Sequence, residues 1–223
     1  MSVFDPRQVP IVRQNSQLSP VPPTAFGAEA LRARFADPPT WKPELQREKS
    51  FGSRKPADAA VLMAIVQHPE PTLLLTQRAR HLSTHSGQIA LPGGKVDATD
   101  ASHVAAALRE THEEVGIAPE RVDVLGCLPV YVTGTAFSVT PVVGLLPIDV
   151  QWVPNTSEVD DVFEVPLAFL LDPANHRLHR MVFEGVEREW YSMPYADGHT
   201  ERFIWGATAG MLRDLYVRAR TTC

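Results

Sequence analysis

The chain has 223 residues, of which 44% are hydrophobic and 21% are charged, and its formal net charge is -5. These values indicate an ordinary globular protein with one main domain and room for a small appendage. The charge is spread without a basic block, and the sequence has no long uncharged apolar run, so neither a nucleic-acid surface nor a membrane span is expected.

The two cysteines, Cys127 and Cys223, lie far apart in the sequence and outside any metal-ligand spacing. They provide no disulfide framework and fit a reducing compartment. The first ten residues, MSVFDPRQVP, have neither a charged start followed by an apolar run nor a small-residue cleavage site. We therefore expect a cytoplasmic protein.

Residues 1–55 are rich in proline and charge, and only GAEALRARFA (27–36) has helical periodicity. Such a composition predicts a Pro-rich N-terminal extension that lies on the domain or is partly mobile, and that contributes little to the core. Deletion of about the first fifteen residues should leave the remainder folded and active, because that stretch has no periodic apolar face.

Short apolar runs begin at Ala59 and continue to residue 147. The segments AAVLMAIVQ and TLLLTQ, separated by HPEP, predict a hairpin of two buried strands. QIALPGG (88–94) predicts a short strand that ends at Pro-Gly-Gly. Two more strands are expected in residues 122–133 and 138–147, around a Thr-Gly-Thr turn.

The last third of the chain alternates between helical and extended patterns. VPLAFLLD (165–172) predicts a short helix, residues 176–195 a hairpin around Glu-Gly, and residues 205–220 an amphipathic helix. Asp160 and Asp161 are interpreted as part of a loop. The whole pattern predicts an α+β fold, an α/β/α sandwich in which helices flank a mixed sheet.

The segment from Gly93 to Gly116 predicts a helix whose last turns carry three glutamates, Glu110, Glu113 and Glu114. A helical wheel puts them opposite an apolar stripe formed by Val104, Leu108, Thr111 and Val115. Ser102 or Asp100 can cap the start of this helix, and Gly116 can end it.

Three carboxylates on one face repel each other, and the negative end of the helix dipole adds to the cost. A solvated acidic face is the ordinary explanation for such a run. Clustered carboxylate oxygens are also the ligands that Mg²⁺ or Mn²⁺ prefers. Glu110 and Glu114, one turn apart, are predicted metal ligands.

The neighbouring residues favour the metal-site interpretation. Arg109 can orient the carboxylates from behind, and the glycines of Pro92-Gly93-Gly94 let the backbone approach a ligand closely. Positive or potentially positive side chains surround this turn, namely Arg78, Arg80, His81, His85 and Lys95. Carboxylates for a cation beside groups for oxyanions predict a site for a phosphate ester or anhydride.

Residues 94–117 resemble the Nudix box, the motif of hydrolases that split nucleoside diphosphates linked to another group. The chain keeps Arg109-Glu110, Glu113-Glu114, Gly116 and Ile117. It departs in having Asp100 for the first Glu of the motif, eight residues instead of seven before Arg109, and Thr111 for an aliphatic residue. The changed spacing leaves two roles open for Asp100, a helix cap and a catalytic contact.

The segment from Leu74 to Gly94 resembles the additional motif of the coenzyme A diphosphatase branch, with Arg78, Leu82, His85, Gly87 and Pro92 to Gly94 in step. The resemblance extends over about Ala59 to Leu215. It implies a Nudix hydrolase domain in residues 56–223, a Mg²⁺ or Mn²⁺ cofactor, and CoA or acyl-CoA as substrate. A homodimer is compatible with the resemblance.

Site roles follow from this resemblance together with the residue chemistry. Metal ligands are Glu110, Glu113, Glu114 and the carbonyl of Gly94; catalytic residues are Arg109, Glu113 and Glu114; substrate-binding residues are Arg78, Arg80, His85, Gly93 and Lys95. Glu158 is an alternative general base. His103 and His112 are expected to be surface or packing residues and not metal ligands, and Trp190, Phe203 and Trp205 are expected in packing, unless one of these aromatic residues stacks on an adenine.

Two alternatives to a coenzyme A diphosphatase remain open at this stage. A diphosphatase for ADP-ribose, NADH or another nucleoside diphosphate derivative would share the Nudix box but not the Leu74 to Gln88 segment. A nucleotide-binding regulator would keep the fold without catalysis, although it would have no reason to retain three repelling glutamates.

Overall fold

The computed structural model describes residues 5–37, 41–53 and 55–221. Within them, the larger sheet has eight strands. They are β2 (Ala57–Val66), β3 (Thr72–Arg78), β4 (Ile89–Ala90), β5 (Gly93–Lys95), β6 (Asp123–Cys127), β7 (Tyr131–Val132), β8 (Phe137–Leu146) and β9 (Val159–Pro166). β2 and β8 pair in parallel and the other pairs are antiparallel, so the sheet is mixed, as the sequence predicts.

The smaller, antiparallel sheet has the order β1-β10-β11-β12. Its strands are β1 (Ile11–Gln14), β10 (Arg177–Phe183), β11 (Val186–Asp197) and β12 (Thr200–Trp205). The helices are α1 (Ala28–Ala36), α2 (His103–Val115), α3 (Leu167–Leu170) and α4 (Gly206–Arg220), and the 3₁₀ turns are η1 (Pro6–Gln8), η2 (Pro23–Ala25), η3 (Pro119–Arg121) and η4 (Pro173–Asn175).

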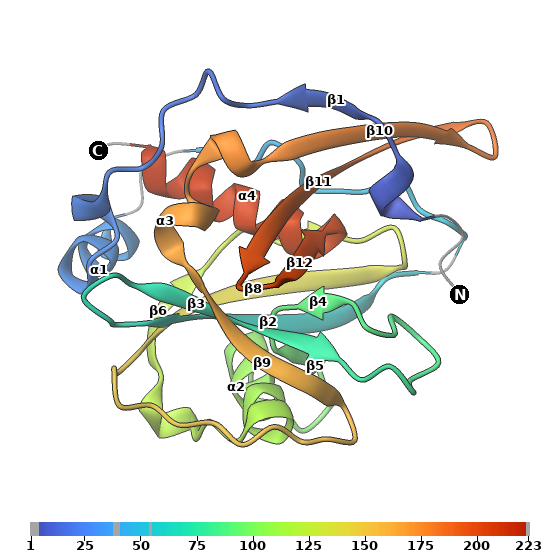
Figure 1. The fold of residues 1–223 in the computed structure, drawn as a ribbon. Helices are drawn as coiled ribbons and strands as arrows, with labels where there is room; N and C mark the ends of the chain where they lie inside the picture. The colour runs from blue at the N-terminus through green and yellow to red at the C-terminus, as the bar shows by residue number, and fades with distance from the viewer. Residues whose placement is uncertain (1–4, 38–40, 54, 222–223) are drawn as a thin grey trace.

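The larger sheet is buried on both faces (Figure 1). α2 covers one face, and α4 lies on the other face, beneath β10 and β11. Successive side chains of β2 therefore enter different cores: Leu62 and Ala64 pack in the cluster of α2, whereas Met63 and Ile65 pack in the cluster of α4. Burial on both faces explains why β2 reads as a continuous apolar run without polar alternation.

The predicted hairpins at β2–β3 and β10–β11 and the C-terminal helix α4 are confirmed. The loop interpretation of Asp160 and Asp161 is wrong, because both residues belong to β9, which pairs with β3. Val159 and Phe163 are buried in this strand while Asp160 is exposed. The two acidic residues obscure the alternation of buried and exposed side chains in β9. The sequence did not predict β12.

The expectation that residues 1–55 contribute little to the core is also wrong. Val21, Ala25, Phe26 and Leu31 are all buried in the same cluster as α4. Prolines interrupt the periodicity of this segment, but apolar side chains between them can still be buried when other elements supply the surface.

The bonds of residues 41–53 join the extension to the domain over long sequence separations. Glu44 accepts two hydrogen bonds from Arg213 of α4, at 2.8 and 3.1 Å. Glu48 accepts from the hydroxyl of Tyr131 at 2.9 Å and from the backbone N–H of Gly134 at 2.8 Å. The segment is thus held against both α4 and the larger sheet.

Two truncations should separate the dispensable part of the extension from the packed part. Deletion of residues 1–14 should leave the fold and the activity intact, because every side chain of edge strand β1 is exposed. Deletion of residues 1–35 removes the buried Val21, Phe26 and Leu31 and should cost more than about 4 kcal/mol of unfolding free energy. Thermal melts of the purified proteins measure both; equal melting temperatures for the two truncations would contradict the packed role.

No helix within the described ranges is long and apolar enough to cross a membrane. Cys127 is a free, exposed thiol in β6. Cys223 lies outside the described residues.

Candidate active site

Helix α2 starts and ends as its sequence predicts. Ser102 is the N-cap and accepts a hydrogen bond from the backbone N–H of Ala105 at 3.1 Å. Gly116 ends the helix in the left-handed conformation, with φ of 72°. Asp100 does not cap the helix; its carboxylate binds Arg109 and accepts from the N–H of Asp97 at 2.8 Å.

The three glutamates of α2 differ in burial, which corrects the helical wheel. Glu114 is only 4% exposed, whereas the side chain of Glu113 is 51% exposed, and Glu110 is partly buried. Glu114 shares the buried side with Thr111, whose hydroxyl donates to the carbonyl of Ala107 at 2.7 Å. The acidic side of the helix therefore turns partly toward the protein interior.

The Gly93-Gly94 turn explains how carboxylates can be buried there. The N–H of Gly93 donates to Oε2 of Glu114 at 3.1 Å. A Cβ added at Gly94 would collide with the carboxylate of Glu110, so this position allows a close approach only without a side chain. The two carboxylates expected to hold a metal thus lie against adjacent glycines.

Arg109 contacts the other carboxylates. Its Nη1 donates to Oε1 of Glu110 and to Oε2 of Glu113, each at 3.1 Å. On the other side, its Nε and Nη2 bind both oxygens of Asp100 at 3.0 and 2.9 Å, and Nη2 also donates to the carbonyl of Lys95 at 3.1 Å. Arg109 thereby links Glu110 and Glu113 to the segment between β5 and α2.

The electrostatics of the site reflect crowded, partly desolvated carboxylates. Burial raises the pKa of Glu114 to about 7, although the N–H of Gly93 and the positive charge of Arg78 oppose this shift. Burial also raises the pKa of Glu110, against the effect of Arg109. Arg109 lowers the pKa of Asp100 by hydrogen bonding. A bound cation would favour the ionised forms of Glu110 and Glu114.

Glu158 belongs to the same group of carboxylates. Its negative charge contributes to the raised pKa values of both Glu110 and Glu114. The backbone places it there: the N–H of Asn155 donates to the carbonyl of Glu114 at 2.9 Å, and the N–H of Ala79 donates to the carbonyl of Glu158 at 2.9 Å. The side-chain amide of Asn155 also donates to Oε1 of Glu158 at 3.3 Å.

Of the expected substrate-binding cations, Arg78 lies nearest to the carboxylates. Its Nη1 is 3.8 Å from Oε1 of Glu114. Arg80, His85 and Lys95 are exposed. Nδ1 of His85 is 2.8 Å from the side-chain amide oxygen of Gln88.

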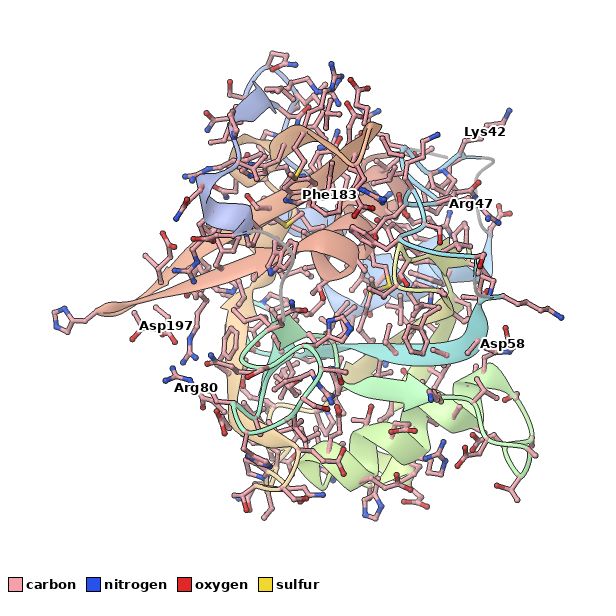
Figure 2. All side chains as sticks on the ribbon, turned by 90° about the vertical axis from the view of Figure 1, so that its right-hand side faces the viewer. Lys42, Arg47, Asp58, Arg80, Phe183 and Asp197 are labelled. Carbon is pink, nitrogen blue, oxygen red and sulfur yellow. The ribbon has the colours of Figure 1, made fainter. Side chains whose placement is uncertain are left out.

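The exposed loop 79–88 lies on the side of the molecule that carries the β11–β12 hairpin. Figure 2 shows Arg80 on the same side as Asp197, which belongs to that hairpin. Arg78 therefore lies beside the carboxylates, whereas Arg80, His85 and Lys95 are at the surface.

The remaining candidates are placed as follows. His103 and His112 are exposed on α2. Trp190 is buried and stacked on His179, with ring centroids 5.7 Å apart, and it meets Trp205 edge-on at 6.5 Å. The guanidinium of Arg7 lies over the ring of Phe203.

The donor set around the glycine turn is suited to a hard cation, since it consists of the carboxylates of Glu110 and Glu114 and the backbone of Gly94. In the part of the chain that the structure describes, no three His, Cys, Asp or Glu side chains converge closely enough to enclose an ion. Two arginines already contact these carboxylates: Arg109 binds Glu110 and Glu113, and the guanidinium of Arg78 lies 3.8 Å from Glu114. A metal would therefore have to compete with these arginines for carboxylate oxygens.

Comparison with known proteins shows which family this chain resembles. The NUDIX domain model matches residues 56–192. Two curated relatives, each described as "Uncharacterized Nudix hydrolase NudL", come from Salmonella paratyphi B and Salmonella newport. Both are 48% identical over 158 residues, which is 70% of this chain and 80% of each relative.

Among solved structures, the Nudix hydrolase RenU from M. smegmatis is 26% identical, with a TM-score of 0.45, over 54% of this chain and 78% of that chain. A MutT/nudix family protein from Enterococcus faecalis is 15% identical, with a TM-score of 0.45, over 84% of this chain and 72% of that chain. With more than half of its length in the NUDIX match, and with Glu110, Glu113 and Glu114 on the helix of the motif, the chain belongs to the Nudix hydrolase family.

Proposed function

We propose that this Nudix hydrolase cleaves the diphosphate of coenzyme A and its thioesters. The products would be 3′,5′-ADP and 4′-phosphopantetheine or its acylated form. The observation that carries the proposal is the position of Arg78: it stands in register with the coenzyme A diphosphatase motif, and its guanidinium lies 3.8 Å from the buried carboxylate of Glu114.

The residues around the turn would divide the chemical work. Glu110 and Glu114, with the carbonyl of Gly94, would hold Mg²⁺ or Mn²⁺. When bound there, the metal would neutralise charge on the diphosphate and make the attacking water more acidic. Arg109 keeps Glu110 and Glu113 in position, and Arg78, near Glu114, would contact a phosphate oxygen next to the metal carboxylates.

A general base must take a proton from the water that attacks phosphorus. Glu113 is tied to Arg109 and is half exposed. Glu158 faces Glu110 and Glu114 from the segment before β9, and Asn155 holds one of its oxygens. We assign the base to Glu158 because Glu113 is held by Arg109, and because the charge of Glu158 acts on both Glu110 and Glu114 whereas that of Glu113 acts on Glu110 alone.

The 3′-phosphate of coenzyme A requires cations beyond those that serve the scissile diphosphate. Arg80, His85 and Lys95 are exposed and lie close in the sequence to Arg78 or to the glycine turn, so they are suited to this role. Arg binds phosphate in a bidentate manner, whereas His adds charge only as the pH falls toward its pKa.

The substrate is tested by comparing kcat/KM for CoA, dephospho-CoA, ADP-ribose and NADH in Mg²⁺ and in Mn²⁺. We expect CoA to be preferred, and Arg80→Met to reduce the preference for CoA over dephospho-CoA. Arg121→Met, which breaks only the exposed pair with Asp149, is the matched control and should leave this ratio unchanged. A tenfold advantage of ADP-ribose or NADH over CoA would overturn the substrate and leave the diphosphatase intact.

A further inference from the structure

Arg202 of β12 lies outside the residues that match the family model, yet it joins three strands. Its side chain is only 13% exposed. Nη1 donates to Oε1 of Gln77 at 3.1 Å, Nη2 to Oδ2 of Asp161 at 2.6 Å, and Nε to Oδ2 of Asp197 at 3.0 Å. The guanidinium also lies over the ring of Phe163, 4.2 Å from its centroid. Only the planar fork of arginine can make this set of bonds at once.

Two of these partners sit next to an irregularity in the larger sheet. Gln77 of β3 pairs directly with Asp161 of β9, but the next pair is Arg78 with Val159, so β9 contains one extra residue. A bulge of this kind bends the strand and re-aims the side chain beside it. Arg202 binds both members of the last regular pair before the bulge.

Arg78, the cation nearest to the carboxylates of α2, is the residue of β3 that lies opposite this bulge. Its guanidinium is 3.8 Å from Glu114. Arg78 is only partly exposed, and its backbone N–H donates to the carbonyl of Gln88 at 2.9 Å. The direction of Arg78 therefore depends on the geometry of β3 at Gln77.

Gln77 also connects Arg202 to the loop 79–88. Its amide Nε2 donates to the carbonyl of Gly87 at 3.3 Å, while the N–H of Gly87 donates to the carbonyl of Arg78 at 3.1 Å. On the other side of the loop, Asp160 accepts from the N–H of Arg80 at 3.0 Å. Both ends of the loop are therefore linked to Arg202, one end through Gln77 and the other through Asp160 and its neighbour Asp161 in β9.

We propose that Arg202 is a positioning residue for substrate binding: it binds the Gln77–Asp161 pair beside the β9 bulge and so holds the base of the loop 79–88, and Arg78 opposite the bulge is thereby aimed at the diphosphate. The β11–β12 hairpin thereby belongs to the recognition apparatus for the substrate. This inference rests on the function proposed above, since the loop it organises carries the predicted contacts to coenzyme A.

The test compares Arg202→Met, Arg202→Lys and Gln77→Met in the full chain. Arg202→Met should raise KM for CoA about tenfold and change kcat by no more than about twofold, because substrate positioning is lost while the carboxylates stay in place. Arg202→Lys keeps the charge but not the fork, so it should show most of the KM increase with a smaller loss of melting temperature. Gln77→Met should give a similar KM increase, and its combination with Arg202→Met should be less than additive.

Arg180→Met is the matched control. Arg180 is an exposed arginine of the same small sheet, and it pairs with Glu189 at 2.6 Å. It should leave both KM and kcat unchanged.

The outcomes separate this inference from the proposed substrate. An unchanged KM in Arg202→Lys and Gln77→Met, with wild-type preference for CoA, overturns the positioning role alone. Wild-type preference for ADP-ribose or NADH overturns the substrate, and the same KM comparison is then made on that compound, where an unchanged KM also overturns the positioning role. A fall in kcat with constant KM would place Arg202 in the chemical step and contradict positioning of the substrate.

Discussion

Glu114→Gln should lower turnover at least about a hundredfold and leave the protein folded. The substitution removes one charged oxygen of the proposed metal site from a buried position that also accepts the N–H of Gly93, so both metal binding and charge stabilisation should weaken. Since the wild-type carboxylate is desolvated, the neutral amide should not reduce the melting temperature of the metal-free protein. Steady-state kinetics and thermal melts measure these two effects.

Two further measurements make the result specific to the site. Glu120→Gln, an exposed glutamate in η3, should keep wild-type turnover. Saturating Mg²⁺ or Mn²⁺ should raise the melting temperature of the wild type, because a ligand that binds only the folded state stabilises it, and should raise that of Glu114→Gln less. Near wild-type turnover in Glu114→Gln would show that the metal ligands lie elsewhere.

Glu158→Gln should lower kcat by roughly a hundredfold or more with little change in KM. A general base contributes about a hundredfold to ten-thousandfold to a rate, and glutamine cannot accept the proton of the attacking water. Asp149→Asn, which changes an exposed carboxylate far from the glycine turn, is the control and should behave as the wild type.

The comparison with Glu113→Gln decides between the two candidate bases. Glu113 is half exposed and hydrogen-bonded to Arg109, so its loss should cost about tenfold or less if Glu158 is the base. A larger loss in Glu113→Gln than in Glu158→Gln would transfer the role to Glu113.

The elements with strong local signals were predictable from the sequence. The run 59–67 indicates a buried strand because β2 has a core on each face, and α2 carries its own cap at Ser102 and its own terminator at Gly116. β9 was missed because two acidic residues interrupt its alternation, and the pairing with β3 that stabilises it joins residues far apart in the chain.

The site was only partly predictable, for a related reason. The helical wheel placed all three glutamates on one polar face. A wheel considers a helix alone, so it cannot show that a strand packs against part of that face. Glu114 is buried because a distant glycine, Gly93, offers a backbone N–H to its carboxylate. That hydrogen bond offsets only part of the desolvation cost, because burial still raises the pKa of Glu114 to about 7.

By itself, the sequence determined the strands β2, β3, β8, β10 and β11, the helices α2 and α4, the α+β class, the end of α2 at Gly116, and the clustering of Glu110, Glu113 and Glu114 beside Arg109. These features depend on residues within a few positions of one another. Tertiary structure alone decided the burial of the extension through the Glu44–Arg213 pair, 169 residues apart, and the link between Arg202 and Gln77, 125 residues apart. Local propensity cannot encode such pairs, because their free energy arises only when folding brings the partners together and removes them from water.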